Sequence, residues 1–201
     1  MAMNQLVLAS TSPRRRELLE SAGVRFEILS PPGEEALPEK GERPAAYAQR
    51  AAHQKALRAA KLPEASGKWI LCADTVVALG GEVLGKPKDA EDAFRMLRKL
   101  SGKTHEVFSA FVLLSPDGKI FRKEWSKTEV DFAKIADERL RAYAACGEPL
   151  DKAGGYAIQG KGSFLIKAIR GSYTNVVGLP LAETLDALEA AGVSENGPPS
   201  P

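Results

Sequence analysis

The sequence is poor in the residues that build disulfide frameworks and zinc sites. Its 201 residues include only two cysteines and two histidines. Cys72 and Cys146 are too few for a disulfide framework, which favours a reducing, intracellular compartment. His53 and His105 stand far apart, with no cysteine or histidine at ligand spacing, so we expect no zinc site.

Aromatic residues and net charge are also low. Aromatics make up 6% of the chain, and 28 basic residues against 26 acidic residues leave a net charge of +2. These values argue against a nucleic-acid-binding protein. No run of about 18 apolar residues is present, and the first residues lack the pattern of a signal peptide. We therefore expect no membrane contact and a cytoplasmic protein.

The composition itself is ordinary. Hydrophobic residues make up 44% of the chain and charged residues 27%, which is typical of a single globular domain at this length. We expect this domain to span residues 1–192. The final stretch contains SENGPPSP, which is polar and rich in proline, and it predicts a flexible C-terminal tail over residues 193–201.

Hydrophobic periodicity and turn residues predict an α/β fold with a mixed sheet. Helices alternate with strands early in the chain, and an antiparallel pair joined by the turn sequence SPDG lies in the middle. We expect strands at 5–9, 26–29, 69–79, 107–114, 119–132 and 163–169, with a short extended piece at 175–178. We expect helices at 13–22, 44–61, 89–100, 137–145 and 181–191.

The stretch LASTSPRRRELL places three consecutive arginines, residues 14–16, at the start of a predicted helix. Cations are disfavoured at that end of the helix macrodipole, so an anion should offset them. A helix N-terminus after a strand presents free backbone N–H groups, and arginines add forks suited to phosphate oxygens. The stretch predicts a phosphate site, although a capping serine with a solvated basic face also accounts for it.

A second candidate is Asp74, in the apolar stretch WILCADTVVAL. A carboxylate inside an apolar strand is costly unless it is hydrogen-bonded, paired or bound to a metal. Strand alternation places Asp74 on the face opposite Ala73 and Thr75. The pattern indicates a general base or a metal-linked carboxylate, with an ordinary strand residue at an exposed edge as the alternative.

The stretch GGEVLGKP nearly matches a P-loop but is not expected to form one. Pro87 stands where the Mg²⁺-binding hydroxyl belongs, and Gly80-Gly81 is typical of a hairpin turn. The hairpin would return Lys86 toward the Asp74 strand, where it becomes a candidate phosphate lysine.

Three further features are weaker when taken alone. Glu34 and Glu35 are adjacent carboxylates that can share a divalent cation with substrate phosphates. Lys55 lies on an alanine-rich helix with no distinguishing neighbour. Gln159 follows a glycine-rich loop, DKAGGYAIQG, and its amide has both the donor and the acceptor needed to read the edge of a base.

Together these stretches resemble the Maf family of nucleoside triphosphate pyrophosphatases, first known as septum formation inhibitors. The resemblance is carried in order by LASTSPRRRELL, ADTVV, GEVLGKPKDAEDAFRMLRKLSGKTHEV, EPLDKAGGYAIQGKG and GSYTNVVGLPL, over roughly residues 6–188. It implies an inosine-triphosphatase-like α/β fold, in which a long mixed sheet and its helices surround a central cleft. It also implies a cytoplasmic homodimer that uses Mg²⁺ or Mn²⁺.

The resemblance also implies roles for single residues. It marks Asp74 as the proton acceptor and as a metal contact, together with Glu35; Glu34 remains an alternative to Glu35. The residues expected to grip the phosphates are Ser10, Arg15, Lys55 and Lys86, and those linked to base choice are Arg14, Thr75 and Gln159.

The implied activity is hydrolysis of dTTP and UTP to the monophosphate and pyrophosphate. The ADT and AIQG blocks match the branch of the family that favours these nucleotides, and modified pyrimidine nucleotides remain open as substrates. Such a nucleotide diphosphatase would cleanse nucleotide pools or act in cell-division arrest, with a cell-division protein as a further partner. The alternative is a non-catalytic, nucleotide-sensing regulator of septum formation that acts through protein binding.

Overall fold

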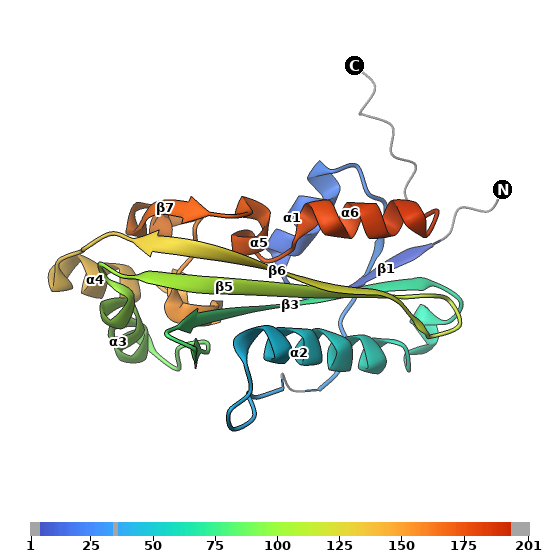
Figure 1. Ribbon diagram of the computed structural model, residues 1–201, viewed down its shortest axis with the longest axis horizontal. Helices are drawn as coiled ribbons and strands as arrows, with labels where there is room; N and C mark the ends of the chain where they lie inside the picture. Colours follow the sequence, from blue (N-terminus) through green and yellow to red (C-terminus); the bar gives the residue numbers. More distant parts are fainter. Residues whose placement is uncertain (1–4, 34–35, 194–201) are drawn as a thin grey trace, which may run out of the picture.

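A mixed seven-stranded sheet runs through the molecule (Figure 1), and the computed structural model describes residues 5–33 and 36–193. The strand order is β2-β1-β3-β5-β6-β7, with β4 paired to β3. β1 is parallel to β2 and β3, and all other pairs are antiparallel, which confirms the predicted α/β class with a mixed sheet. The strands are β1 Leu6–Ala9, β2 Glu27–Leu29, β3 Trp69–Leu79, β4 Glu82–Leu84, β5 Thr104–Leu114, β6 Ile120–Phe132 and β7 Ile166–Arg170.

Helices cover both faces and one end of this sheet. In Figure 1, α2 lies on one side of the long strands and α1 and α6 lie on the other. The helices are α1 Pro13–Ser21, α2 Pro44–Ala59, α3 Ala90–Leu100, α4 Asp137–Ala144, α5 Tyr173–Val177 and α6 Leu181–Ala190. Short 3₁₀ helices are η1 Pro63–Ala65, η2 Glu148–Asp151, η3 Ala153–Gly155 and η4 Gly160–Leu165.

The central strand β3 divides its side chains between two cores. Ile70 and Cys72 pack with the buried alanines of α2, while Leu71 and Ala73 pack with residues of β1, α1 and α6. Because successive side chains of a strand point to opposite faces, β3 needs apolar residues at nearly every position. This explains why its sequence is a continuous apolar run rather than an alternating one.

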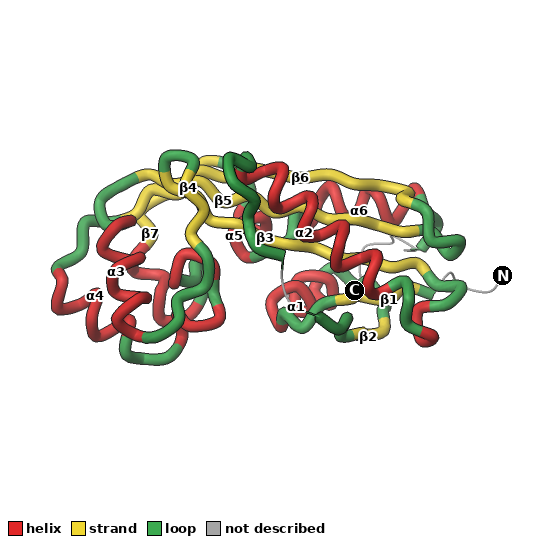
Figure 2. The backbone as a smooth tube through the Cα atoms, turned by 90° about the horizontal axis from the view of Figure 1, so that it is seen from below, coloured by secondary structure: helices red, strands yellow, loops and turns green. Residues whose placement is uncertain are grey.

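A third core lies at the other end of the sheet. It joins α3 and α4 to the ends of β3, β5 and β6, with Leu97, Leu100 and Leu140 fully buried. Figure 2 shows α3 and α4 gathered at that end, and α1, α2 and α6 at the opposite end. α3 begins at Asp89, whose side chain accepts a hydrogen bond from the Asp92 N–H, as expected of an N-cap.

One edge of β3 is left open between two partners. On that edge β3 pairs with β1 as far as Leu71, and pairing resumes only at Val77 with β4. The intervening residues pair with β5 alone, on the other edge. The chain leaves β1 after Ala9 and turns into α1, so this open edge faces the start of α1. Asp74 and Thr75 lie in the middle of it.

The hairpin at Gly80-Gly81 is confirmed, because β3 and β4 pair antiparallel across it and both glycines have positive φ. The rejection of a P-loop therefore holds. Of the predicted tail over 193–201, all but Val193 lies outside the described residues. Cys72 is buried, Cys146 is exposed and both are free thiols. Among the described helices, none combines the length and apolar character needed to cross a bilayer.

One predicted element is wrong, and one begins too early. Residues 175–178 belong mostly to helix α5 rather than to an extended piece, because Ser172 caps the helix by accepting a hydrogen bond from the Asn175 N–H. The strand predicted at 163–169 is 3₁₀ helix η4 up to Leu165 and becomes β7 only from Ile166. The N–H groups of Lys161 and Gly162 bond the Glu148 carboxylate, which fixes this segment as a turn.

Candidate active site

A cavity of about 690 Å³ opens along the unpaired edge of β3. Residues of α1, α2, β3, β4, η3 and α5 and of the connecting loops line it. It includes every predicted site residue that lies in the described ranges: Ser10, Arg14, Arg15, Lys55, Asp74, Thr75, Lys86 and Gln159. Glu34 and Glu35 lie outside the described residues. Segments far apart in the chain thus meet at one cavity.

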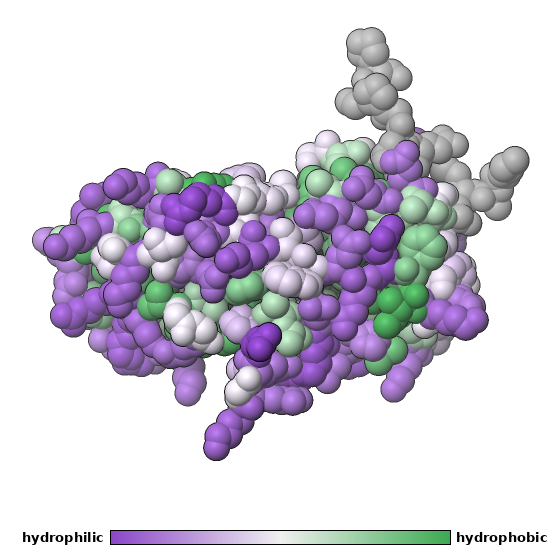
Figure 3. Space-filling model, viewed as in Figure 1, coloured by the Kyte–Doolittle hydropathy of each residue, from purple (hydrophilic) through white to green (hydrophobic). Residues whose placement is uncertain are grey.

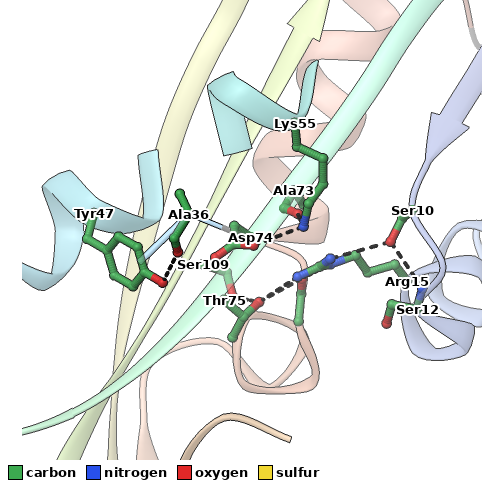
Figure 4. A network of polar contacts seen from close by, with 11 residues as sticks. Ser10, Ser12, Arg15, Ala36, Tyr47, Lys55, Ala73, Asp74, Thr75 and Ser109 are labelled. Carbon is green, nitrogen blue, oxygen red and sulfur yellow. Dashed lines mark hydrogen bonds and ion pairs between the residues drawn. The ribbon is translucent and has the colours of Figure 1, made fainter. Parts of the chain in front are cut away.

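Asp74 forms an ion pair with Lys55 on the α2 side of the sheet (Figure 4). The Lys55 Nζ donates to Asp74 Oδ1 at 3.0 Å and also lies 3.5 Å from the Ala73 carbonyl oxygen. Both side chains are largely buried, with exposures of 12% for Lys55 and 15% for Asp74. The ion pair holds the Asp74 carboxylate in a fixed position beside the cavity.

Arg15 is buried on the opposite side of the sheet, at 8% exposure, and its guanidinium is held in one orientation. Nε donates to the Gly178 carbonyl at 2.8 Å, Nη2 to Thr75 Oγ1 at 3.1 Å and Nη1 to Ser10 Oγ at 3.4 Å. The same Ser10 oxygen accepts the Ser12 N–H at 3.2 Å. A guanidinium fixed in this way is preorganised for binding oxyanions.

The three consecutive arginines divide by direction. Arg15 points inward, Arg14 is half-buried and lines the cavity, and Arg16 is exposed and pairs with Glu20 at 3.6 Å. Ser12 occupies the N-cap position of α1 but makes no side-chain capping bond. The start of α1 therefore presents two arginines to the cavity and one to solvent.

Thr75 lies at the centre of a buried polar network. Its hydroxyl contacts the Ser109 hydroxyl at 2.8 Å and the Gly178 carbonyl at 3.1 Å, in addition to Arg15. Ser109 in turn donates its N–H to Asn175 Oδ1 at 3.0 Å and its hydroxyl to the Asn175 carbonyl at 2.8 Å. This network ties α5 to β3 and β5, and it places the Gly178 carbonyl against Arg15.

The opposite wall is built from the segment that follows α4. Tyr156 lines the cavity and its hydroxyl lies 2.6 Å from His105 Nε2, while burial lowers the pKa of His105 to about 4 and keeps it neutral. Burial raises the pKa of Asp151, but the hydrogen bond from Lys152 and the charges of Lys152 and Arg14 lower it overall. The charge of Arg14 thus contributes to lowering the pKa of Asp151, which lies on this wall.

Sequence reasoning missed several cavity residues. Arg58 lies three residues after Lys55 on α2, and its Nε is buried without a hydrogen-bond partner among the described residues. Tyr47 also lines the cavity, and its hydroxyl donates to the Ala36 carbonyl at 2.6 Å. The i, i+3 spacing of Lys55 and Arg58 was the available signal, because it puts both on one face of the helix.

The lining of the cavity combines cations with apolar side chains. The cations include Lys86, two residues beyond β4, and those of α1 and α2. The apolar and aromatic lining includes Val77, Leu84, Val107, Tyr156 and Ile158. A ligand with a polyanionic chain and a flat organic group matches this combination, because cations neutralise the chain and apolar walls cover the ring.

The carboxylates of the described residues do not form a metal cage. No group of three or more metal-ligating side chains occurs among them. Asp74 nevertheless offers one carboxylate inside a cavity lined with lysine and arginine side chains. Mg²⁺ is commonly held by one or two carboxylates together with substrate phosphates, so this donor set fits a divalent cation that arrives with a polyphosphate.

Comparisons with known proteins cover nearly the whole chain. Residues 5–191 match the family model described as Maf-like protein. A dTTP/UTP pyrophosphatase of Geobacter sp. (strain M21) is 50% identical over 197 residues, 98% of this chain and 100% of that protein. The dTTP/UTP pyrophosphatase of Myxococcus xanthus (strain DK1622) is 49% identical over 189 residues, 94% and 93% of the two chains.

A solved structure also aligns over most of the chain. The nucleoside-triphosphatase / dITP/XTP pyrophosphatase of Mycobacterium abscessus aligns with a TM-score of 0.44 at 21% sequence identity, covering 94% of each chain. The family match, by contrast, includes every described residue named above as lining the cavity.

Proposed function

Because the chain belongs to the Maf family, we propose that it is a nucleoside triphosphate pyrophosphatase that hydrolyses dTTP and UTP. It is then a hydrolase of acid anhydrides that releases a nucleoside monophosphate and pyrophosphate. The observation that carries the proposal is the Asp74–Lys55 ion pair, which lies inside a cavity lined by further cations. A carboxylate base beside a polyphosphate-binding set is the arrangement that anhydride hydrolysis needs.

In the proposed reaction Asp74 accepts a proton from the attacking water. The water oxygen forms a bond to the α-phosphorus, the bond between that phosphorus and its bridging oxygen breaks, and pyrophosphate leaves. Lys55 orients the carboxylate through the ion pair at 3.0 Å. Proton transfer to a positioned carboxylate typically contributes about 10²- to 10⁴-fold in rate.

The cations of the cavity bind the triphosphate in this proposal. Ser10, Arg15 and Lys86 grip the phosphate oxygens together with Lys55, and Arg15 is already held in place by three hydrogen bonds. A preorganised donor stabilises the charge that develops in the transition state without having to reorient. This interpretation accounts for two inward-facing arginines at a helix N-terminus, where cations are otherwise disfavoured.

Base choice is assigned to Arg14, Thr75 and Gln159. The Gln159 amide offers both a donor and an acceptor to the edge of a pyrimidine, beside the apolar wall formed by Tyr156 and Ile158. The Thr75 hydroxyl is bonded to Arg15, Ser109 and Gly178, which fixes its position in the cavity wall.

The proposal includes a divalent cation, Mg²⁺ or Mn²⁺. Asp74 would hold it together with the substrate phosphates, and Glu35 is the second proposed contact. Such a cation supplies charge neutralisation of the phosphates and stabilises the leaving pyrophosphate.

A non-catalytic regulator of septum formation is the less favoured function. The curated relatives are named as pyrophosphatases, and the proposed base, its lysine partner and the cations are all present in one cavity. Nucleotide-pool cleansing is the role that follows directly from the proposed reaction. A link to cell-division arrest through a protein partner would be an additional property of the enzyme.

We further propose a cytoplasmic homodimer. Two free cysteines suit a reducing compartment. Figure 3 shows a largely hydrophilic face with an apolar patch toward the end where β5 turns into β6, and the large exposed apolar side chains of β6 are Ile120, Phe121 and Trp125. A second copy of the chain would bury these apolar side chains. Sedimentation equilibrium measures the mass of the protein in solution and so distinguishes a monomer from a dimer.

The test is product analysis in ¹⁸O-labelled water. The purified protein is incubated with each nucleoside triphosphate plus Mg²⁺ or Mn²⁺, with an EDTA-treated sample as control. We expect dTTP and UTP to give labelled monophosphate and unlabelled pyrophosphate, and EDTA to abolish turnover. Label in pyrophosphate, or release of orthophosphate, would mean attack at another phosphorus, and no turnover of any nucleotide would favour the regulator.

A further inference from the structure

The cavity wall that carries Gln159 is held from behind by two side chains that do not reach the cavity. Tyr156, Ala157, Ile158 and Gln159 line the cavity, whereas neither Tyr143 of α4 nor Glu148 of η2 does so. Both of these side chains hydrogen-bond to the loop of residues 157–162. Gln159 lies in the middle of this loop and is half-buried.

The Glu148 carboxylate binds the far end of the loop. Its Oε2 accepts the Lys161 N–H at 3.0 Å, and its Oε1 accepts the Gly162 N–H at 2.9 Å. Two backbone donors on one carboxylate fix the direction of the chain just after Gln159. Charge-assisted hydrogen bonds of this kind are among the stronger ones in proteins.

Tyr143 binds the near end of the loop and joins it to Glu148. Its hydroxyl donates to Glu148 Oε1 at 2.8 Å and accepts the Ala157 N–H at 3.3 Å. Burial and the bond to Glu148 raise the pKa of Tyr143, so the hydroxyl keeps its proton as a donor. The two side chains therefore hold the backbone on both sides of Gln159.

The loop sequence is fitted to this arrangement. Gly160 has φ +72°, and a Cβ there would lie 2.8 Å from Glu148 Oε2. A Cβ at Gly162 would lie 2.4 Å from the Tyr143 hydroxyl oxygen. Only glycine allows the backbone to approach the two side chains this closely. The glycines of the stretch IQGKG thus serve contact with Glu148 and Tyr143 rather than flexibility.

We propose that Glu148, supported by Tyr143, is a specificity-determining positioning residue that holds the loop of residues 157–162 so that Gln159 meets the pyrimidine edge. This inference rests on the proposed function, because it takes Gln159 as the residue that reads the base. A glutamine amide discriminates between uracil and cytosine only if its donor and acceptor are held at fixed places, since a mobile amide can satisfy either base.

The test measures base preference through binding of nucleotide analogues, so its result does not depend on catalytic turnover. Calorimetric titration with the α,β-imido analogues of UTP and CTP gives the ratio of their dissociation constants. We expect the wild-type protein to prefer the uracil analogue, and Glu148→Gln to reduce that preference about tenfold or more. The glutamine amide places an N–H₂ against one of the two backbone donors and releases that part of the loop.

Matched variants separate positioning from stability. Glu138→Gln changes an exposed glutamate of the neighbouring helix α4 and should leave the preference unchanged. Tyr143→Phe removes one hydroxyl and should reduce the preference in the same direction, which keeps the test valid if Glu148→Gln fails to fold. In the double variant Glu148→Gln/Gln159→Ala the preference should equal that of Gln159→Ala alone.

Three results would overturn the inference. In the first, the wild-type protein shows no preference for the uracil analogue. In the second, Glu148→Gln has a lowered melting temperature but an unchanged preference. In the third, the effects of Glu148→Gln and Gln159→Ala on the preference add in the double variant. The proposed function fails separately, if wild-type protein with Mg²⁺ or Mn²⁺ releases no pyrophosphate while the analogue still binds with uracil preference. Amide hydrogen exchange across residues 157–162 should rise in Glu148→Gln and remain unchanged in Glu138→Gln.

Discussion

Adjacent residues of β3 serve two sides of one cavity. The carboxylate of Asp74 meets Lys55 of α2 on one face of the sheet, and the hydroxyl of Thr75 meets Arg15 of α1 on the other. If β3 were paired on both edges here, a neighbouring strand would stand between the side chains on its two faces, and they could not line one cavity. Here β1 ends before this point and β4 begins after it, so both side chains reach the open edge.

Replacing Asp74 by asparagine removes the proposed proton acceptor and keeps the shape of the side chain. We expect kcat for UTP to fall by about 10²- to 10⁴-fold, because the amide oxygen can still accept from Lys55 but cannot take a proton from water. Steady-state kinetics measures the change, and thermal unfolding with analogue binding serves as control. Full turnover by a folded Asp74→Asn variant would remove Asp74 from the role of base.

Neighbouring arginines of α1 provide a matched pair. Arg15→Ala removes the buried guanidinium, and kcat/KM for UTP should fall about 10²-fold or more. Arg15→Lys should not restore activity fully, because an ammonium cannot reproduce the three fixed hydrogen bonds. Arg16→Ala removes an exposed side chain that pairs with Glu20, and kcat/KM should stay within about twofold. Equal effects of Arg15→Ala and Arg16→Ala on kcat/KM would contradict the assigned geometry.

At this scale the sequence indicated most of the charged residues of the cavity but not all of them. A charged residue in an apolar strand, such as Asp74, is conspicuous because burial of an unpaired carboxylate is costly. Arg58 and Tyr47 are not conspicuous, since an arginine or a tyrosine on an amphipathic helix is ordinary. The i, i+3 spacing puts Arg58 on the helix face of Lys55, but that this face meets the cavity follows from the packing of α2 on β3.

At the scale of elements, long strands and helices were predictable; among the short ones, β1 and β2 were expected within one residue of their bounds, whereas α5 was not. β3, α3 and β6 were expected within one or two residues of their bounds, because their periodicity extends over ten or more residues. α5 has five residues and was expected to be extended. Its helical state depends on a cap at Ser172 and on distant partners of Asn175 in β5 and β6.

The stability of α5 should therefore depend more on Asn175 than on the cap. Asn175 is fully buried and bonds the Ser109 N–H, the Val107 carbonyl and the Thr128 hydroxyl. We expect Asn175→Ala to lower the free energy of unfolding by roughly 3 kcal/mol, because it leaves buried polar groups unpaired. Ser172→Ala should cost about 1 kcal/mol, the usual value for an N-cap. Urea unfolding of both variants measures the difference, and a smaller loss for Asn175→Ala would refute this account.

At the scale of the whole molecule, β3 and β5 join the three cores. β3 contributes Ile70 to the core under α2, Leu71 to the core under α1 and α6, and Val77 to the core under α3 and α4. β5 is shared among the cores in the same way. The cavity takes residues from both ends of the sheet, so the relative placement of the ends determines its geometry. We propose on this basis that the chain folds as a single domain.

A single domain should unfold in one transition, whichever core is weakened. Leu97→Ala in the core under α3 and Leu19→Ala in the core under α1 each remove a fully buried side chain, and each should cost about 2–5 kcal/mol. Neither Trp69 nor Trp125 belongs to the α3 core, so tryptophan fluorescence reports on the rest of the molecule. In Leu97→Ala the urea midpoint from fluorescence should shift together with the midpoint from far-UV circular dichroism. If fluorescence kept its wild-type midpoint while the dichroism signal became biphasic, the α3–α4 end would be a separate folding unit, and the two walls of the cavity would not be held in a fixed relation by the sheet.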